Sequence, residues 1–482
     1  MASPILRDAE SGIVIDLHRA PIHGDVSSAL AALERLDAGA IANADEGRMV
    51  GHYWLRDSTR APDAETRAQI EATLEQIRTF DPGPFRTLVQ IGVGGSALGP
   101  ELVHDALSVP NAPAFEVLDT VDPYAIEELL ARLDPASTLV IVASKSGSTI
   151  ETSIATDAVE RHFERAGVPF SERAIAVTIP GSKLAERARN WKAVFPMFDW
   201  VGGRTSVCSA VGLVPMHLLG IDVDQFLAGS ARMDEWNRSA APANPAAHLA
   251  LLWTHPDCRE LCVMPYTNRL RHLTRYLQQL IMESLGKANT RSGATIHSGL
   301  TVFGNKGSAD QHAIVQQLRD GPTGVQVHLI DVAAPASTVV RIAADVQFAL
   351  LAGTGDALSE VGRPVVGISL PEMNAFGLGS LIALYERAVG LAAELLDINA
   401  YNQPGVEAGK KAASVNLSQM QDVFGRLTST PQTAAQLAHD VGISDTRAWR
   451  LAVHLAATGR AQTTTGKSPS EDRFWAVENS SI

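Results

Sequence analysis

The chain has 482 residues, of which 45% are hydrophobic and 19% charged, and its formal net charge at pH 7 is −13. This length exceeds what one hydrophobic core organises, so we expect two or three domains, and the composition is typical of packed globular proteins. The negative charge disfavours a general affinity for nucleic acid or anionic membrane, and no run of about 18 apolar residues predicts a transmembrane helix.

Three cysteines, Cys208, Cys258 and Cys262, are too few and odd in number for a disulfide framework. Cys258 and Cys262 are four residues apart, but no nearby His or Cys completes a zinc site, so we expect buried thiols and no metal. The first residues lack the basic and apolar segments of a signal peptide. A cytoplasmic protein is therefore expected.

Residues 1 to about 50 have a mostly helical, polar pattern. From Phe85 onward, short β-rich runs alternate with helical stretches, which predicts βαβ units and a parallel sheet. The Ala-, Pro- and Asn-rich segment 239–247 marks a boundary, after which the alternation resumes. Strands are predicted within 86–93, 115–119, 138–144, 174–180 and 195–200, and then within 260–266, 325–332 and 363–370.

We therefore predict an α/β protein with two tandem domains. The predicted divisions are a helical N-terminal segment (1–50), a first α/β domain (51–238), a second α/β domain (239–410) and a helical C-terminal arm (411–482). The arm contains a helix-turn-helix pattern, but residues 425–482 carry six Arg or Lys against five Asp or Glu. A DNA reader needs a basic surface, so a packing arm is favoured over nucleic-acid binding.

The first loop that could carry chemistry is IGVGGSALGP, residues 91–100, directly after a predicted strand. Its extra glycine and hydroxyl, Gly95 and Ser96, suit a loop whose backbone approaches a ligand closely. A tight structural turn and a nicotinamide dinucleotide site are the alternatives. The dinucleotide fingerprint would use Gly92, Gly94, Ala97 and Asp119.

The second loop, VASKSGSTIETS at 142–153, runs from a buried-type strand into a helix. Ser148 and Glu151 have capping-box spacing, which predicts that the helix begins there. Amides at a helix N-terminus among hydroxyls suit one phosphomonoester, while a simple N-cap is the alternative. The groups concerned are Ser144, Lys145, Ser146, Ser148 and Thr149.

Arg204 follows paired glycines at a strand-to-helix junction, where it either stabilises developing negative charge or forms a structural salt bridge. In the helix at 272–287, Gln279 and Glu283 lie four apart, beside an apolar stripe of Leu273, Leu277, Leu280 and Ser284. Gly286 is expected to end that helix, leaving Glu283 at its negative end. Such a carboxylate is either a general base or an ordinary surface group.

Two further segments contribute polar groups. Ser308 and Gln311 have capping-box spacing, which places His312 in the first turn of a helix, either as an acid–base group or as a capped surface residue. Gln403 precedes a Pro-Gly turn, and Lys410 follows on a helix that begins near Val406.

Together the motifs GGS, SKSGST, GGR, MESLGK, QHA and QPGVEAGK, in this order, resemble the glucose-6-phosphate isomerase family. The resemblance extends from VGHYWLR at 50–56 to about Lys411. It implies two sugar-isomerase (SIS-type) α/β/α sandwich domains with parallel-rich sheets, no cofactor, and a homodimer with shared active sites. It also implies an enzyme of glycolysis and gluconeogenesis that interconverts glucose 6-phosphate and fructose 6-phosphate.

The resemblance further implies a role for each motif. Glu283 would move the proton between C2 and C1, and Arg204 would stabilise the enediolate. Lys410 and the partner subunit's His312 would assist ring opening. The groups expected to hold phosphate and sugar hydroxyls are Gly95, Ser96, Ser144, Lys145, Ser146, Ser148, Thr149, Gln279 and Gln403.

The chain departs from the family pattern at Leu285, where Asn is usual, and at Ala309 and Asp310 beside His312. The end beyond 425 does not resemble the usual one. A non-catalytic sugar-phosphate sensor is the alternative function, but it would have no use for Glu283, His312 and Lys410.

Overall fold

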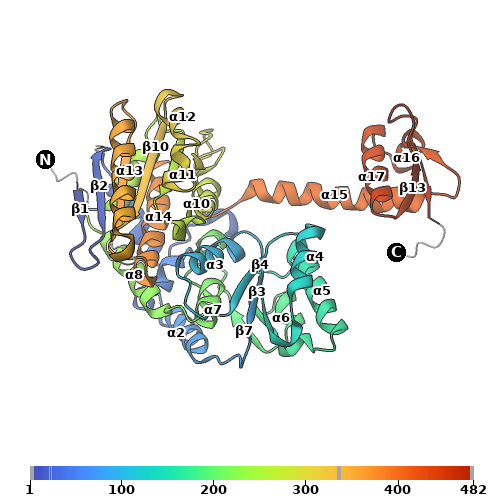
Figure 1. The fold of residues 1–482 in the computed structure, drawn as a ribbon, viewed down its shortest axis with the longest axis horizontal. Helices are drawn as coiled ribbons and strands as arrows, with labels where there is room; N and C mark the ends of the chain where they lie inside the picture. The colour runs from blue at the N-terminus through green and yellow to red at the C-terminus, as the bar shows by residue number, and fades with distance from the viewer. Residues whose placement is uncertain (1–4, 21, 23, 241, 334–337, 478–482) are drawn as a thin grey trace. The chain divides into compact units, whose positions relative to one another are not determined.

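The computed structural model describes residues 5–20, 22, 24–240, 242–333 and 338–477. The chain divides into two compact units, Met1–Asn402 and Gln403–Ile482. The first unit contains two β-sheets, each with helices packed on it, and the second contains a long helix and a small helical bundle with its own sheet (Figure 1).

The first sheet has five parallel strands in the order β4-β3-β5-β6-β7. All six residues of the central strand β5 are buried, which is expected when helices cover both faces of a parallel sheet. The strands are β3 (Thr87–Ile91), β4 (Ala114–Leu118), β5 (Thr138–Ala143), β6 (Ala174–Thr178) and β7 (Ala193–Pro196).

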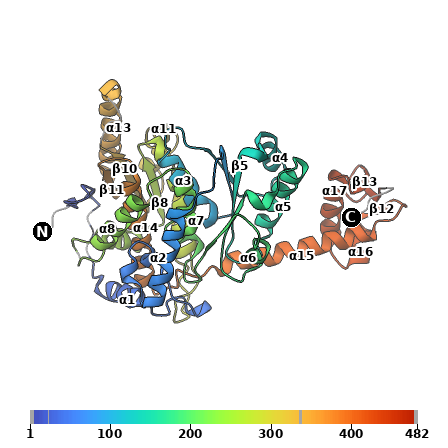
Figure 2. The same ribbon diagram turned by 90° about the horizontal axis from the view of Figure 1, so that it is seen from below.

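Successive side chains of these strands face opposite helical layers, because residues alternate across a strand. Val89 and Val140 pack with the layer of α4 and α5, whereas Leu88 and Leu139 belong to the core on the other face. Figure 2 shows α4 and α5 on one side of β5 and α3 and α7 on the other. The helices are α3 (Gly95–Ala106), α4 (Pro123–Arg132), α5 (Ile150–Arg165), α6 (Lys183–Arg187) and α7 (Ala210–Leu218).

The second sheet has the order β1-β2-β11-β10-β8-β9, and its last four strands are parallel to one another. Val327 and Met264 face the layer of α12 and α13, while Ile330 and Val263 face the core around α14. Two α/β/α sandwiches are thus confirmed. The elements are β8 (Glu260–Pro265), β9 (Thr301–Phe303), β10 (Val325–Val332), β11 (Val365–Leu370), α12 (Val315–Asp320), α13 (Arg341–Ser359) and α14 (Ala375–Leu395).

The N-terminal segment differs from the helical prediction between residues 5 and 19. It forms β1 (Ile5–Arg7) and β2 (Val14–Arg19), which extend the second sheet in an antiparallel sense. In β2, Ile15 and Leu17 are buried while Val14, Asp16 and His18 are not, so the period is that of a half-buried strand. The predicted helix exists only from α1 (Ser27–Asp37).

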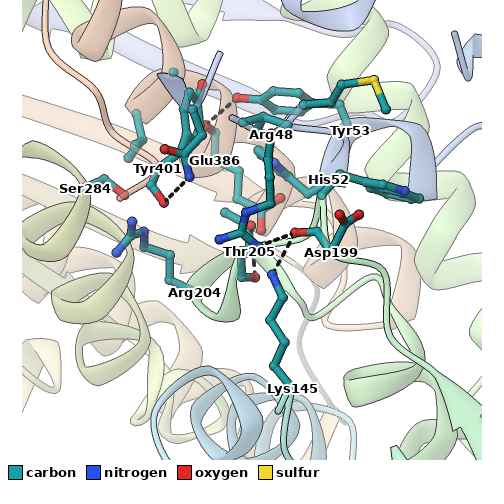
Figure 3. A pocket seen from close by; sticks show the side chains of 17 residues that line it. Arg48, His52, Tyr53, Lys145, Asp199, Arg204, Thr205, Ser284, Glu386 and Tyr401 are labelled. Atoms are coloured by element: carbon teal, nitrogen blue, oxygen red, sulfur yellow. Dashed lines mark hydrogen bonds between the residues drawn. The ribbon is translucent and has the colours of Figure 1, made fainter. Parts of the chain in front are cut away.

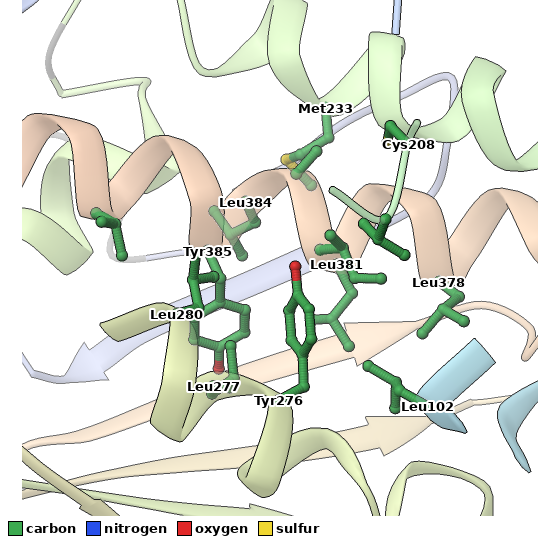
Figure 4. Close-up of a cluster of buried hydrophobic side chains, with 14 of the residues drawn as sticks. Leu102, Cys208, Met233, Tyr276, Leu277, Leu280, Leu378, Leu381, Leu384 and Tyr385 are labelled. Carbon is green, nitrogen blue, oxygen red and sulfur yellow. The ribbon is translucent and has the colours of Figure 1, made fainter. Parts of the chain in front are cut away.

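One continuous core joins the two sandwiches, and α14 lies at its centre. This helix is long and apolar enough to cross a membrane, but 89% of its apolar window is buried inside the protein. Figure 4 shows Leu378, Leu381 and Leu384 of α14 among side chains from other elements, including Tyr276 and Leu277 of α10 (Leu273–Leu277). Other helices of this unit are α2 (Ala64–Thr79), α8 (Val223–Trp236), α9 (Pro245–Trp253) and α11 (Gly307–Gln311).

The second unit has the element order of a winged helix-turn-helix, with a core that includes Leu437, Leu455 and Phe474. The predicted turn between two helices is confirmed, because Gly442 ends α16 in the left-handed conformation and Ser444 caps α17. The expectation of a purely helical arm was wrong, since three strands form a sheet. The elements are α15 (Pro404–Arg426), β12 (Gln432–Thr433), α16 (Ala434–Val441), α17 (Asp445–Ala457), β13 (Ala461–Thr464) and β14 (Arg473–Ala476).

Candidate functional site

The glycine loop and the hydroxyl loop lie side by side at the carboxyl ends of two neighbouring strands. They follow β3 and β5, which pair directly in the first sheet. The connection after β3 leads to β4 on one side, and the next returns to β5 on the other, so this is a topological switch point. Parallel α/β sheets bind ligands at such points.

The glycine loop is packed too tightly for larger residues. A Cβ atom on Gly95 would lie 1.8 Å from the carbonyl oxygen of Gly203, and one on Gly94 would lie 2.8 Å from Nε2 of Gln279. Gly94 also has φ +59°, and Gly95 begins α3 with Ser96 in its first turn. The absent side chains therefore let three predicted motifs, namely the glycine loop, the GGR loop and the Gln279 helix, come together.

In the hydroxyl loop, Ser144 Oγ accepts a hydrogen bond from the Gly147 amide at 3.1 Å, and the Ser146 and Ser148 hydroxyls are 2.6 Å apart. The prediction that Ser148 caps the helix was wrong: α5 begins at Ile150 and its N-cap is Thr149, which makes no side-chain cap bond. The reason is that Ser148 pairs with Ser146 instead. The Thr149 hydroxyl and the first amides of α5 are thus left for an anion.

The side chain of Lys145 points toward Asp199, in the segment that precedes Arg204 (Figure 3). Its ammonium donates to the backbone carbonyls of Asp199 at 2.7 Å and Val201 at 3.2 Å. Burial, helped by the nearby charge of Arg48, lowers the pKa of Lys145 to about 8. The amine therefore titrates near neutral pH.

Arg204 and Glu283 form a buried ion pair. Their Nη1 and Oε2 atoms are 3.1 Å apart, and the side chains are 6% and 16% exposed. The two atoms are not aligned as a hydrogen bond, and neither has a hydrogen-bond partner among the described residues. Burial lowers the pKa of Arg204 although Glu283 opposes the shift. A buried carboxylate with free lone pairs beside a fixed cation is suited to proton transfer with charge stabilisation.

The helix that carries Glu283 changes its winding before it ends. After α10 it continues as the π-helix η8 (Gln278–Glu283), a form often found at functional sites. The predicted apolar stripe is confirmed, because Leu273, Leu277, Leu280 and Ser284 are all buried. The stripe anchors the helix, so Gln279 and Glu283 are held on its other side.

Sequence reasoning missed Lys287, which lies beside this pair. Its ammonium donates to the carbonyl oxygens of Glu283 at 2.8 Å and Asn402 at 3.0 Å. Burial and the charge of Arg204 lower the pKa of Lys287 to about 8. Its place in MESLGK, four residues after Glu283 on one helix, was the available signal.

His312 is not where its spacing predicted. It is the C-cap of α11, not a first-turn residue, and its side chain is exposed. The helix begins earlier, at Gly307, because the buried Asp310 carboxylate accepts from the Asn305 amide at 2.6 Å. No hydrogen bond or ion pair links His312 to Glu283 within the described ranges.

Gln403 and Lys410 belong to the second unit, on α15 and its N-cap. Lys410 is 54% exposed and pairs with Glu407 at 2.9 Å. The helix starts at Pro404, two residues before the predicted start. Among the predicted site residues, therefore, those from residue 95 to residue 312 lie in the first unit, and these two lie outside it.

The departure from the family pattern at Leu285 is accommodated in the fold. Leu285 is buried in the main core, and its carbonyl accepts from Ser298 at 2.7 Å. The three cysteines are buried and free, as predicted. No group of three or more potential metal ligands occurs in the part of the chain that the structure describes.

Known proteins are similar to this chain over most of its length. The family model of phosphoglucose isomerase matches residues 25–359 and 357–434. Glucose-6-phosphate isomerase of Synechococcus sp. (strain JA-3-3Ab) is 46% identical over 471 residues, covering 90% of this chain and 88% of the relative. The chloroplastic glucose-6-phosphate isomerase 1 of Arabidopsis thaliana is 43% identical, covering 87% of this chain and 75% of that protein.

A solved structure agrees with these matches. The glucose-6-phosphate isomerase of Chlamydia trachomatis superimposes with a TM-score of 0.78 at 26% identity, covering 87% of this chain and 90% of that one. The fold, the order of the motifs and the sequence identity point the same way. The chain belongs to the phosphoglucose isomerase family.

Proposed function

We propose that this chain is an aldose–ketose isomerase that interconverts glucose 6-phosphate and fructose 6-phosphate. The observation that carries the proposal is the buried pair of Arg204 and Glu283, 3.1 Å apart, beside two loops suited to a phosphate. The family assignment and its named relatives support the same reaction. The isomerisation is redox-neutral, so it needs a base and a charge stabiliser but no redox cofactor.

In the proposed reaction, the Glu283 carboxylate removes the proton from C2 of the open-chain aldose. The electron pair of the broken C2–H bond forms the C1–C2 double bond of an enediolate, and the carbonyl oxygen on C1 takes up the negative charge. Arg204 stabilises this charge because its guanidinium is fixed and buried before the substrate arrives. Glu283 then returns the proton to C1 while the proton of the C2 hydroxyl passes to the C1 oxygen, which leaves a carbonyl at C2 and gives the ketose.

The phosphate is proposed to lie at the N-terminus of α5. Thr149, Ser144 and Ser146 supply hydroxyls there, and the uncapped amides of the first turn face the anion. Ser148, Lys145, Gly95 and Ser96 would complete the pocket from the adjacent loops. Gln279 at the glycine loop and Gln403 would orient sugar hydroxyls.

Ring opening needs a proton moved between the ring oxygen and the C1 hydroxyl. We assign this to Lys410 and to the partner subunit's His312, in a homodimer with shared sites. Helix α13 supports the dimer, since it exposes Ile342 (80%), Phe348 (63%) and Val346 (52%). Ile342 and Val346 lie one helical turn apart, and exposed apolar side chains that lie together can mark an interaction surface.

A coupled assay on Glu283→Gln tests the central proposal. Gln keeps the size and polarity of the side chain but cannot take the proton, so we expect kcat to fall by about 10²- to 10⁴-fold with KM changed only a few-fold. The control is Glu394→Gln, which removes a carboxylate that also pairs with an arginine, Arg291, away from these loops. Near-normal turnover of Glu283→Gln contradicts the mechanism.

The same assay in EDTA, with mannose 6-phosphate as a second substrate, tests substrate choice and metal independence. A cytoplasmic location remains a proposal; the names of the relatives include one chloroplastic protein. None of the comparisons favours a non-catalytic sensor or a nicotinamide enzyme. Asp119, which a dinucleotide site would use at the end of β4, pairs with Arg275 at 2.8 Å, so it is engaged in a structural contact.

A further inference from the structure

Beside Arg204 lies a cavity of about 40 Å³ lined by both polar and apolar side chains, which we call the His52 cavity. Figure 3 shows His52, Tyr401 and Arg204 around it, with Lys145 and Asp199 at one end. Space of this size holds about two or three water molecules when polar groups line it. The lining residues used below are Asn43, His52, Tyr401 and Arg204.

Three buried polar atoms in the cavity wall lack a partner among the described residues. They are the two ring nitrogens of His52 and the hydroxyl oxygen of Tyr401. The ring centroids of His52 and Tyr401 are 6.4 Å apart, and no direct hydrogen bond joins them. Polar groups buried at this depth are paired in almost all folded proteins, with protein or with water. The two side chains therefore need a bridging partner.

The chemistry of His52 restricts what that partner is. Burial and the positive charges of Arg56, Arg387 and Arg204 hold the pKa of His52 well below its usual range, although Asp234 opposes them. The imidazole is therefore neutral, with one nitrogen that donates and one that accepts. Burial raises the pKa of Tyr401, so its hydroxyl also both donates and accepts. Water matches all of these groups at once.

The cavity is coupled to Arg204 through the backbone beside Tyr401. Nη2 of Arg204 donates to the carbonyl oxygens of Ala400 and Asn402, each at 2.9 Å. Those carbonyls flank Tyr401 in the chain, so the position of the Tyr401 ring sets the positions of both acceptors. Asn43 holds the same segment, because its amide donates to the Tyr401 carbonyl at 3.5 Å.

We propose that His52 and Tyr401 bind ordered water in this cavity and thereby position Arg204 against the enediolate. Both are positioning residues, since they act through Arg204 and not on the substrate. The catalytic part of the inference rests on the proposed isomerase function, whereas the water site does not. Loss of the water loosens the 400–402 segment and lets the guanidinium move.

Tyr401→Phe removes one oxygen atom and keeps the ring, and His52→Leu removes both nitrogens. A displaced guanidinium affects the charged transition state more than the neutral substrate. We therefore expect kcat to fall about 10- to 100-fold in each variant, with KM within a few-fold of wild type. His52→Gln, which keeps a donor and an acceptor, should recover most of the activity.

Two further measurements separate positioning from general structural damage. An aldonate phosphate, whose carboxylate mimics the enediolate, should bind more weakly in parallel with the fall in kcat. The double variant His52→Leu/Tyr401→Phe should be scarcely worse than either single variant, because both changes remove the same water. Thermal unfolding midpoints show whether each variant is folded, and Tyr401→Phe carries the test if His52→Leu does not fold.

A high-resolution crystal structure of the wild type tests the water site independently of activity. Water within hydrogen-bond distance of His52 and Tyr401 supports the proposal, and a dry cavity or a bound anion overturns it. Wild-type kcat and analogue affinity in Tyr401→Phe, or strictly additive effects in the double variant, also overturn it. A wild-type protein without isomerase activity refutes the proposed function but leaves the crystallographic test of the water site intact.

Discussion

Glu283 and His312 come from motifs fewer than thirty residues apart, yet their surroundings differ. Glu283 is 16% exposed, paired with Arg204 and carried by a helix whose other face is wholly buried. His312 is an exposed residue at the end of a five-residue helix, and Lys410 is exposed on α15 in the other unit. The first unit alone thus holds the groups proposed for proton transfer and most of those proposed for phosphate binding, whereas the two groups proposed for ring opening are exposed.

The difference follows from what each step requires. Stabilising an enediolate needs fixed dipoles and charges in a protected place, and only a packed core provides them. Groups that open the ring must be reached by a cyclic sugar before the site closes around it. Exposed groups that come together when two subunits form a dimer are accessible in this way. The dimer is therefore part of the proposed site.

The largest expected effect comes from mixing subunits that carry different substitutions. This experiment tests whether Glu283 and His312 act from different chains of a dimer. Glu283→Gln and His312→Gln homodimers should each lose most activity. If each site uses Glu283 of one chain and the partner's His312, a mixed dimer has one intact site, and random mixing restores roughly one quarter of wild-type activity. The measurement is turnover after joint refolding or co-expression. No recovery means that both residues act from one chain.

Gly95→Ala tests whether the proposed proton-transfer and phosphate-binding groups depend on close packing of the glycine loop against the Arg204 loop. The new Cβ would lie 1.8 Å from the Gly203 carbonyl oxygen, so the glycine loop or the Arg204 loop must shift. We expect kcat/KM to fall about 100-fold and the free energy of unfolding to fall by about 1–3 kcal/mol.

The matched control is Gly203→Ala on the facing loop, where a Cβ meets nothing within 4 Å. Assays and denaturant unfolding should show little change. Equal losses in the two variants would mean that close packing of the loops is not what matters.

The smallest expected effect is a pH dependence of KM that arises from titration of Lys145. With a pKa of about 8 its amine is charged below that pH and neutral above it, so attraction for the phosphate is lost as pH rises. We expect KM to rise a few-fold, about threefold to tenfold, between pH 7 and 9. Initial rates across this range measure it.

Lys145→Arg keeps the charge throughout and should flatten the KM profile. Lys287 titrates in the same range, so Lys287→Arg is the control that should leave the KM profile unchanged. A rise in KM that persists in Lys145→Arg assigns the titration to another group.

The same linkage predicts a stability effect. The pKa of Lys145 is lower in the folded chain than its ordinary value of 10.5, so the unfolded chain binds more protons between about pH 8 and 10.5. The contribution of this residue to stability is therefore least below pH 8 and increases as pH rises through that window.

Much of the fold could be predicted from local patterns in the sequence. The strands β8, β10 and β11 lie within the predicted ranges because each is rich in apolar residues and largely buried, as expected of a doubly covered parallel strand. The three-residue strand β9 was missed, since so short a segment carries no period. The N-terminal strand β2 was missed because its alternation competed with a helical pattern nearby.

By itself, the sequence determined two tandem α/β domains and the motif order that assigns the family, because these depend on local hydrophobic period and residue type; the sandwich architecture followed from the family resemblance. Only the tertiary structure decided that Arg204 faces Glu283, that Gly95 meets Gly203, and that His52 and Tyr401 share a cavity. These contacts join segments 79 to 349 residues apart, and no local pattern encodes the pairing of such distant side chains. The placement of His312 was decided in the same way, by a buried Asp310 that outweighed the capping-box spacing.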